Sequence, residues 1–592
     1  MTDGRSPGTA ARISLALVGL MWCLPFIQPR HHFPLPHFYS EWLAAVLGLA
    51  ALTVVVMPRY AQGLPLPRIA LTPLALALLL LLHLVLLKAA YAQQVFLAML
   101  YLLWAVVLMV LGALLRREVG LTALCTVLAW FLVAGGLLNA VAGILQHYEL
   151  RGPLESVIAT KLGPRAYGNL VQANHFADHM ALALASLGLL FARDRLPAWV
   201  VSLLAGVLLF ALALAASISA WLYVALLAIL AAGLYARDTT SANRRLAVYA
   251  MALLLGFAAA QGLTGLPWLE APVPVVTATE RLFEPVPSVG IRLQLWHEAL
   301  LIFLQSPLMG VGIGQFAWHH FSLADTAGVA PLAGLYHNAH NIVLQLMAEM
   351  GAAGMLILVG GVVVWLWGLR RLPFTPDSWW MLSLLGVVGL HSLIEFPLWY
   401  AYFLGIAAVV FGAGECAHHS VRRPHVAQAG FAVLLVAGWL SAASLVRNYY
   451  VLEVSLFPRP QKATRAEIER TNRELLSVHG SLLTPYVELA FARVLDLDSR
   501  DLDRKLQFSG RVMRFAPTAV IAYQHSLFVA LKGDLTEAAR LLDRAAAVYP
   551  ERLGAFTSDL ANLDTADKMK IAPYLDRLRK HREAQQRRAS PR

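Results

Sequence analysis

Two histidines and a glutamate open one of the long apolar runs of the chain. If a helix begins at His337, residues three and four positions apart share a face, and His337, Asn341, Gln345 and Glu349 form a polar ladder with His340 beside its upper end. Polar side chains inside a bilayer are costly and usually mark a functional site. A histidine with an ordinary pKa of about 6.5 can remove a proton from a hydroxyl group, and a nearby carboxylate can orient it. The alternative is that the ladder only joins helices through hydrogen bonds.

Two more groups of polar side chains lie where other apolar runs begin or end. Gln172, Asn174 and His175 stand at the start of one run. The uncharged amides of Gln172 and Asn174, like that of Asn341, suit the hydroxyls of a sugar. The second group separates two runs and contains His391, Glu395, Tyr400 and Tyr402. A carboxylate such as Glu395 can orient a histidine, and the aromatic rings suit a sugar face or the aromatic belt of a membrane interface.

Three arginines lie in polar segments next to these groups, at Arg165, Arg281 and Arg292. A guanidinium group is a permanent cation whose planar fork fits phosphate oxygens. Arg165 and Arg281 equally suit contact with membrane lipid phosphates.

The composition indicates a polytopic membrane protein and excludes a soluble globule. Of 592 residues, 59% are hydrophobic and 14% are charged, and the mean hydropathy is +0.63. The net charge of +12 therefore concerns membrane topology, and we expect no nucleic-acid partner. Cys23, Cys125 and Cys416 lie in or beside apolar runs, so neither a disulfide nor a metal cluster is expected. The first apolar run lacks a cleavage signal and is expected to be a retained span.

Apolar runs of about 17 residues or more predict spans. The predicted spans number thirteen, near residues 12–28, 41–57, 70–88, 94–115, 121–144, 172–192, 197–215, 217–235, 246–263, 340–368, 379–396, 398–415 and 428–446. With a cytoplasmic N-terminus, nearly every inside loop carries a basic pair, such as Arg116 and Arg117. The odd number of spans then places residues 448–592 outside, and it brings all the polar groups to the outer leaflet.

The segment 264–339 is the longest predicted loop of the membrane part. It contains an amphipathic piece at 292–306 and a glycine-rich piece at 307–316, which we expect on the membrane surface or re-entering beside the polar ladder. His319 and His320 in this loop are expected at an interface or in solvent. The glycines do not indicate a nucleotide loop, because no strand precedes them. No Walker motif supports an ATP-driven pump, and no HExxH motif supports a catalytic metal.

The last part of the chain has a higher charge density and no predicted span. Residues 516–550 predict a helix–turn–helix unit close to one tetratricopeptide repeat, with Gly533 and Asp534 in the turn. The alternative is a generic helical hairpin. We therefore predict an all-α protein with two domains, a membrane helical bundle at 1–447 that includes the loop 264–339, and a helical, TPR-like domain at 448–592.

Several of these residues form motifs known from one superfamily. The run from His340-Asn341 to Glu349-x-Gly351, with the upstream Arg292-x3-Trp296 and Pro307-Leu308-x-Gly310-Val311-Gly312, resembles the O-antigen ligase/polymerase superfamily. Gly168-x3-Gln172-x-Asn174-His175, His391-Ser392-x2-Glu395-x-Pro397-Leu398-Trp399-Tyr400 and the helical C-terminal region are similar to the PglL-type bacterial protein O-oligosaccharyltransferases. The resemblance extends over nearly the whole chain.

The resemblance implies a GT-C-like glycosyltransferase of the bacterial inner membrane that needs neither a metal nor another cofactor. Its substrates would be an oligosaccharide on undecaprenyl pyrophosphate and Ser or Thr hydroxyls of periplasmic proteins such as pilins. The essential histidine and glutamine of the family then correspond to His340 and Gln172, its tyrosine to Tyr400 or Tyr402, and its pyrophosphate-binding arginine to Arg292. Where members often have Ser-Arg, this chain has Ser219-Ala220, which leaves Arg281 or Arg165 to replace that arginine.

The expected roles divide the candidate site residues into three sets. His340, Glu349, Tyr400 and Gln172 are expected to be catalytic, and Arg292, Arg281 and Arg165 to bind the donor pyrophosphate. Contact with the glycan or the acceptor is expected from Asn174, His175, His337, Asn341, His391, Glu395 and Tyr402. Two other functions remain open: an O-antigen ligase acting on lipid A–core or an O-antigen polymerase, and a transporter of lipid-linked glycan.

Overall fold

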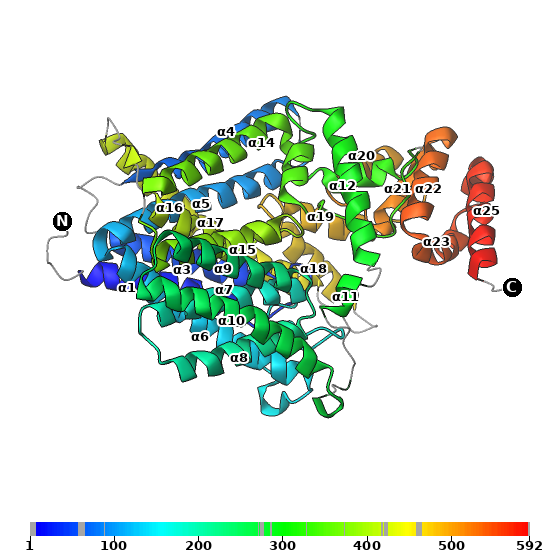
Figure 1. The fold of residues 1–592 in the computed structure, drawn as a ribbon. Helices are drawn as coiled ribbons and strands as arrows, with labels where there is room; N and C mark the ends of the chain where they lie inside the picture. The colour runs from blue at the N-terminus through cyan, green and yellow to red at the C-terminus, as the bar shows by residue number, and fades with distance from the viewer. Residues whose placement is uncertain are drawn as a thin grey trace. The chain divides into compact units, whose positions relative to one another are not determined.

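The predicted all-α class is confirmed by a computed structural model. It describes residues 8–56, 65–87, 89–269, 272, 278–283, 287–326, 328–371, 373–415, 418–419, 424–456 and 464–589. Within these ranges, the strands are limited to β1 (Leu66–Pro67) and β2 (His418–His419), which pair antiparallel with Leu66 opposite His419. All other regular structure is helical (Figure 1).

The chain divides into two compact units. Unit 1 comprises Met1–Ala77, Leu100–Val286 and Ile357–Val446, and unit 2 comprises Leu78–Met99, Pro287–Leu356 and Arg447–Arg592. Four helices have residues in both units: α4 (Leu71–Leu86), α5 (Ala92–Val119), α14 (Ile342–Gly368) and α17 (Pro424–Leu456).

The other helices of unit 1 follow the apolar runs of the sequence. They are α1 (Thr9–Met21), α2 (Leu24–Ile27), α3 (Phe38–Val56), α6 (Leu121–His147), α7 (Ala173–Ala192), α8 (Ala198–Leu214), α9 (Ser219–Arg237), α10 (Ser241–Thr264), α11 (Glu280–Phe283), α15 (Pro376–Ser392) and α16 (Ala401–Gly414). Short 3₁₀ helices occur at Arg68–Ala70, Gly152–Leu154, Pro267–Leu269, Leu369–Arg371 and Pro397–Trp399.

Helix α7 is the central helix of unit 1. It packs against α6, α8, α9, α10 and α15 (Figure 1). Of the residues in its most apolar stretch, 94% are buried inside the protein. After its first two turns α7 is almost entirely apolar, and a helix that is apolar on all sides is usually buried. Its neighbour α6 approaches closely at Gly136, where an added Cβ would lie 2.3 Å from Ala183 Cβ. Polar residues at the start of α7 therefore lie inside the bundle.

The described part of the chain contains ten helices that are long and apolar enough to cross a membrane, where the sequence predicts thirteen spans. The remaining three predicted spans are also helical, but shorter. They are α8, α15 and α16, with 17, 17 and 14 residues. The second of these ends at Ser392, before the short 3₁₀ helix Pro397–Trp399. The chain is a multi-pass membrane protein.

Unit 2 contains two helices of the long loop and the helices of the C-terminal region. The first two are α12 (Pro287–Gln305) and α13 (Phe316–Leu323). The C-terminal region contains α18 (Arg465–Val478), α19 (Thr484–Ala492), α20 (Leu502–Phe515), α21 (Ala519–Lys532), α22 (Leu535–Val548), α23 (Leu553–Asp559), α24 (Thr565–Lys570) and α25 (Ala572–Ala589). Its 3₁₀ helices are Pro550–Arg552 and Leu560–Asn562.

The predicted helix–turn–helix unit at 516–550 is confirmed by α21 and α22. Gly533 joins them with a φ of 108°, a left-handed conformation that favours glycine. The Asp534 side chain then accepts the Glu537 N–H at 3.0 Å and caps α22. Buried residues of both helices share a core that also includes Phe321 of α13.

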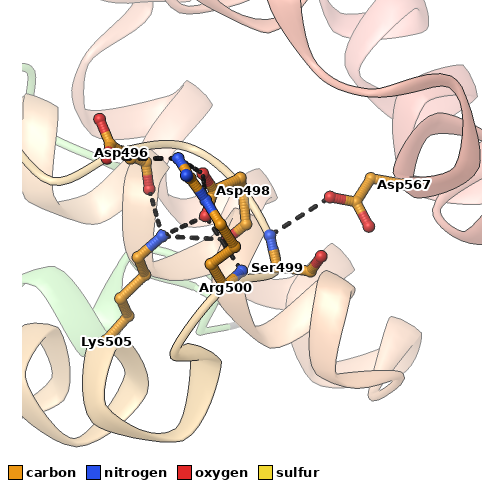
Figure 2. A network of polar contacts seen from close by, with 6 residues as sticks. All are labelled: Asp496, Asp498, Ser499, Arg500, Lys505 and Asp567. Atoms are coloured by element: carbon orange, nitrogen blue, oxygen red, sulfur yellow. Dashed lines mark hydrogen bonds and ion pairs between the residues drawn. The ribbon is translucent and has the colours of Figure 1, made fainter.

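A polar network orders the loop between α19 and α20 (Figure 2). Lys505 Nζ donates to the Asp496 carbonyl at 2.8 Å and lies 2.5 Å from Asp498 Oδ1. Arg500 Nε donates to Asp498 Oδ2 at 2.7 Å. The Ser499 N–H donates to Asp567 of α24 at 3.2 Å, so the loop is tied to a helix more than 60 residues further along the chain.

Candidate active site

The predicted site residues fall into two groups, one in each unit. Group 1 lies in unit 1 and contains Arg165, Gln172, Asn174, His175, Arg281, His391, Glu395, Tyr400 and Tyr402. Group 2 lies in unit 2 and contains Arg292, His337, His340, Asn341 and Glu349. We describe the geometry within each group.

Asn174 connects the polar residues at the start of α7. Its Oδ1 atom accepts hydrogen bonds from Arg165 Nη2 at 2.7 Å and from Ser217 Oγ at 3.1 Å. Its Nδ2 atom donates to Glu395 Oε1 at 3.0 Å. Glu395 is 4% exposed, and a buried carboxylate needs such donors. Three predicted residues, Arg165, Asn174 and Glu395, are thus brought into direct contact.

Arg165 and Arg281 both donate hydrogen bonds to the turn between α8 and α9. Arg165 Nε donates to the Ala215 carbonyl at 2.8 Å, and Arg281 Nη1 donates to the Ala216 carbonyl at 2.7 Å. The last carbonyls of a helix have no partner inside it, and cations stabilise them. The arginines therefore cap α8, and they place two positive charges within a few residues of Ala220.

His391 has two buried partners that the sequence analysis missed. Its Nδ1 atom lies 2.6 Å from Tyr223 Oη and 3.4 Å from Asp178 Oδ2, and His391 and Asp178 are both 0% exposed. His391 Nε2 has no hydrogen-bond partner among the described residues. Asp178 had one signal in the sequence, namely that it is an acidic residue inside an otherwise apolar run.

His175 and Tyr400 belong to an aromatic cluster with His37. The Tyr400 ring lies 4.8 Å from the rings of His37 and His175, measured between centroids. Neither ring nitrogen of His175 has a hydrogen-bond partner within the described part of the chain. Tyr402 instead packs 5.0 Å from Phe26 and is 0% exposed, while Tyr400 is half-buried. Of the two tyrosines, Tyr400 is therefore the more accessible.

Gln172 occupies the N-cap position of α7, just before its first helical residue. Its backbone is extended, with a φ of −142°, and its side chain does not cap the helix. Gln172 Oε1 is buried and makes no hydrogen bond to any described residue. A buried acceptor without a partner needs an explanation, and a bound substrate hydroxyl would supply the missing donor.

In group 2, the prediction of one helical ladder from His337 to Glu349 is wrong for the residues before Ile342. Helix α14 begins at Ile342, so His337, His340 and Asn341 precede it. Asn341 Oδ1 accepts the N–H groups of Val343 at 3.0 Å and Leu344 at 3.2 Å. Asparagine is among the strongest N-cap residues, and this cap starts the helix five residues later than the polar periodicity predicts.

His340 has a left-handed backbone with a φ of 51°. Its N–H donates to Asn338 Oδ1 at 3.2 Å. The preceding N–H, of Ala339, donates to Gln345 Oε1 at 2.7 Å. The imidazole is half-buried and lies at the entrance to α14, whereas His337 is exposed.

Glu349 binds the glycine-rich loop rather than a histidine. Its Oε1 atom accepts the Phe316 N–H at 3.1 Å, and the N–H groups of Gly314 and Gln315 also bond to the carboxylate. The side chain is 2% exposed. The loop also pairs with the α14 backbone, for example from Gly312 N–H to the Glu349 carbonyl at 3.0 Å.

His320 is buried, so the expectation of an interfacial or solvated side chain is wrong. Its Nδ1 atom lies 2.6 Å from Glu298 Oε2, and each side chain is 2% exposed. Glu298 also accepts from Gln294 Nε2 at 3.2 Å. Arg292 lies on the same helix, α12, and is half-buried. The Glu298–His320 pair thus joins α12 to α13 through groups with low exposure.

Comparisons with known proteins agree with the resemblance drawn from the motifs. A family model described as "O-Antigen ligase" matches residues 180–359, and one described as "Virulence factor membrane-bound polymerase, C-terminal" matches residues 379–561. A "General O-oligosaccharyltransferase" from Acinetobacter baylyi is 25% identical over 505 residues, which are 83% of this chain and 85% of the relative. The first match contains His340, and the second contains His391, Glu395 and Tyr400.

Proposed function

Because a family model of O-antigen ligases matches residues 180–359 and an O-oligosaccharyltransferase is similar over most of the chain, we propose that the protein transfers a preassembled oligosaccharide en bloc from undecaprenyl pyrophosphate to Ser or Thr hydroxyls of periplasmic proteins such as pilins. The observation that carries this proposal is the length of the similarity. The relative that bears the name of an O-oligosaccharyltransferase aligns with 83% of the chain.

In the proposed reaction, the acceptor hydroxyl oxygen attacks the anomeric carbon of the first sugar. The bond from that carbon to the pyrophosphate oxygen breaks, and undecaprenyl pyrophosphate leaves with the electron pair. His340 takes the proton of the hydroxyl as general base. Pyrophosphate is a good leaving group, so positioning and charge stabilisation supply most of the rate.

The arginines would hold the pyrophosphate. We assign this role to Arg292, with Arg165 and Arg281 as further cations at the α8–α9 turn. Their contacts with the Ala215 and Ala216 carbonyls fix both guanidinium groups in place. A guanidinium has five N–H donors, so one group can bind a carbonyl and an oxyanion together.

The remaining residues would contact the glycan or the acceptor, or position those that do. Gln172, Asn174, His175 and Tyr400 lie together at the start of α7 and beside it. Glu349 contributes by holding the loop 314–316, because its carboxylate accepts backbone N–H groups there. His391 is fully buried beside Asp178 and Tyr223, and we assign it a positioning role.

The proposed location is the bacterial inner membrane, with the N-terminus in the cytoplasm and the site and the C-terminal domain in the periplasm. The basic pairs in alternate loops support this orientation. The domain at 448–592 would recruit the acceptor, because stacked helical hairpins form protein-binding surfaces.

A ligase that attaches the glycan to lipid A–core is the second candidate, favoured by the description of the family model matched at 180–359. The test uses purified full-length protein, a lipid-pyrophosphate oligosaccharide and two acceptors, a pilin-like protein and lipid A–core, with EDTA present. Intact mass reports glycan on the protein, and gel mobility reports glycan on the lipid. Glycan on the protein supports the proposal, whereas glycan on lipid A–core alone would replace it with the ligase.

A further inference from the structure

Unit 2 contains a partly open cavity of about 340 Å³ that none of the predicted site residues lines. Its walls come from the end of α4, the loop before α5, the segment 311–319 and helix α20. His83 and Leu87 line one side, and His319, Arg511 and Arg514 line another. Both α4 and α5 are candidate membrane spans, so the cavity lies where two such helices are connected.

The charged groups that line this cavity are all cationic. Arg511 and Arg514 lie three positions apart and therefore on one face of α20, and no Asp or Glu is among the lining residues. Arg511 Nη2 donates to Glu488 Oε1 at 2.8 Å outside the cavity wall. Arg514 packs 5.4 Å from the Trp318 ring and makes no ion pair or hydrogen bond with any described residue.

His83 is a second and independent sign of a ligand. It is 2% exposed, and neither of its ring nitrogens has a hydrogen-bond partner among the described residues. A buried polar group of this kind is expensive unless something pairs with it. A neutral imidazole has one N–H donor, which a ligand oxygen would satisfy.

His319 adds a further polar group beside Arg514. Burial and the charge of Arg514 lower the pKa of His319 to about 4. His319 is therefore neutral at pH 7, and its ring adds a hydrogen-bonding group without adding charge. The rest of the wall is largely apolar and includes Leu87, Val95 and Val311.

We propose that this cavity binds the phosphate group of a lipid. Arginine matches phosphate oxygens in charge and geometry, and the apolar wall at the ends of two membrane helices suits the adjoining glycerol or isoprenoid carbons. The volume lies within the range of small-ligand sites. The lipid is either an anionic phospholipid or a polyprenyl phosphate, and the experiment separates these sources. The proposal does not depend on the transfer reaction.

The test measures lipid binding to the full-length protein by native mass spectrometry. The probes are phosphatidylglycerol, undecaprenyl pyrophosphate, phosphatidylcholine and inorganic phosphate. Arg514→Gln is the diagnostic variant, because Arg514 has no ion-pair partner among the described residues that the substitution would leave unpaired. Arg504→Gln is its matched control, since Arg504 is an exposed arginine on the same helix that does not line the cavity. The thermal unfolding temperature of each variant shows that the fold is intact.

The expected result is that Arg514→Gln weakens binding of one lipid phosphate about tenfold, as for a lost charged hydrogen bond, while Arg504→Gln has no effect. Loss for phosphatidylglycerol identifies a membrane phospholipid, and loss for undecaprenyl pyrophosphate alone identifies an isoprenoid phosphate. His83→Phe, which keeps the ring and removes its nitrogens, should weaken the same lipid. The proposal would be overturned if Arg514→Gln bound each lipid as tightly as Arg504→Gln does. It would also be overturned if the protein bound inorganic phosphate and none of the lipids.

Discussion

At the scale of single residues, His340 is held by the backbone and side chains on both sides of it. It takes the left-handed conformation, with a φ of 51°, while Asn341 caps α14. Non-glycine residues in this conformation carry strain that the surrounding structure must offset, and they occur often at functional sites. The contact from the His340 N–H to Asn338 stabilises the turn. This geometry places the imidazole just before the N-terminus of α14, and the proposed reaction assigns it the role of general base.

The first prediction concerns His340→Gln. Glutamine can keep hydrogen bonds but cannot accept a proton at neutral pH, so transfer should fall about 10²–10⁴-fold with normal membrane insertion. The initial rate at saturating donor measures the loss. His297→Gln is the matched control, because His297 is an exposed histidine on α12, and its rate should equal that of the wild type. A His340→Gln enzyme with full activity would remove this residue from the mechanism.

Residue types and spacing led us to propose Arg165, Asn174 and Glu395 as site residues, but they did not reveal that these side chains contact one another. His391 and Tyr223 are separated by 168 positions, and their contact depends on how α9 and α15 pack. A single sequence contains no signal for such a pair. The burial of His320 against Glu298 was missed for the same reason, because its partner lies on another helix.

At the scale of the helix, α14 is interrupted at Gly351. That residue has a φ of 65° and a ψ of −166° inside an otherwise helical segment. The loop 307–312 packs into the break, where Ala352 N–H donates to the Pro307 carbonyl at 2.8 Å. Irregular backbone beside a membrane helix is tolerated when protein groups satisfy its hydrogen bonds. The break therefore positions the loop that Glu349 binds.

The second prediction compares two glycines of this helix. Gly351→Ala would place a Cβ 2.4 Å from the Leu308 carbonyl oxygen in a conformation that alanine rarely adopts. The backbone strain alone costs about 1–3 kcal/mol, so the unfolding temperature and the transfer rate should both fall. Gly360→Ala is the matched control, because its Cβ meets no atom within 4 Å and alanine stabilises a helix interior by about 0.5–1 kcal/mol. Equal stability of the two variants would show that the break is not required.

Apolar run length predicted a helix at each of the thirteen expected spans, because a span needs about 20 apolar residues, but it did not predict α11, α12 and α13 of the long loop. It did not predict where α14 begins. The polar periodicity continued upstream of Ile342, but the N-cap formed by Asn341 makes the helix begin at Ile342. Short-range capping thus overrode a longer pattern. The break at Gly351 was also missed, since glycine is common in membrane helices and does not itself interrupt them.

At the scale of the whole molecule, helix α8 decides on which side of the membrane the later segments lie. Its 17 residues extend about 26 Å, slightly less than the hydrocarbon core of about 30 Å. Helices α15 and α16 are consecutive. If both cross the membrane, or if neither does, the segments after them lie on the same side. If α8 did not cross, the connection between α9 and α10, with Arg237, Arg244 and Arg245 at its two ends, would lie outside. That would contradict the positive-inside rule.

The third prediction follows from whether α8 counts as a membrane crossing. It uses single cysteines in a variant that lacks the three native ones. With α8 crossing, an impermeant maleimide added to spheroplasts should label Glu583→Cys in α25 and leave Asp238→Cys, between α9 and α10, unlabelled until lysis. Ser156→Cys, which is exposed and precedes α8, should be labelled in either topology and controls for access. Labelling of Asp238→Cys in intact spheroplasts, with protection of Glu583→Cys, would mean that α8 does not cross. The C-terminal helices would then lie in the cytoplasm, where they would not meet a periplasmic acceptor.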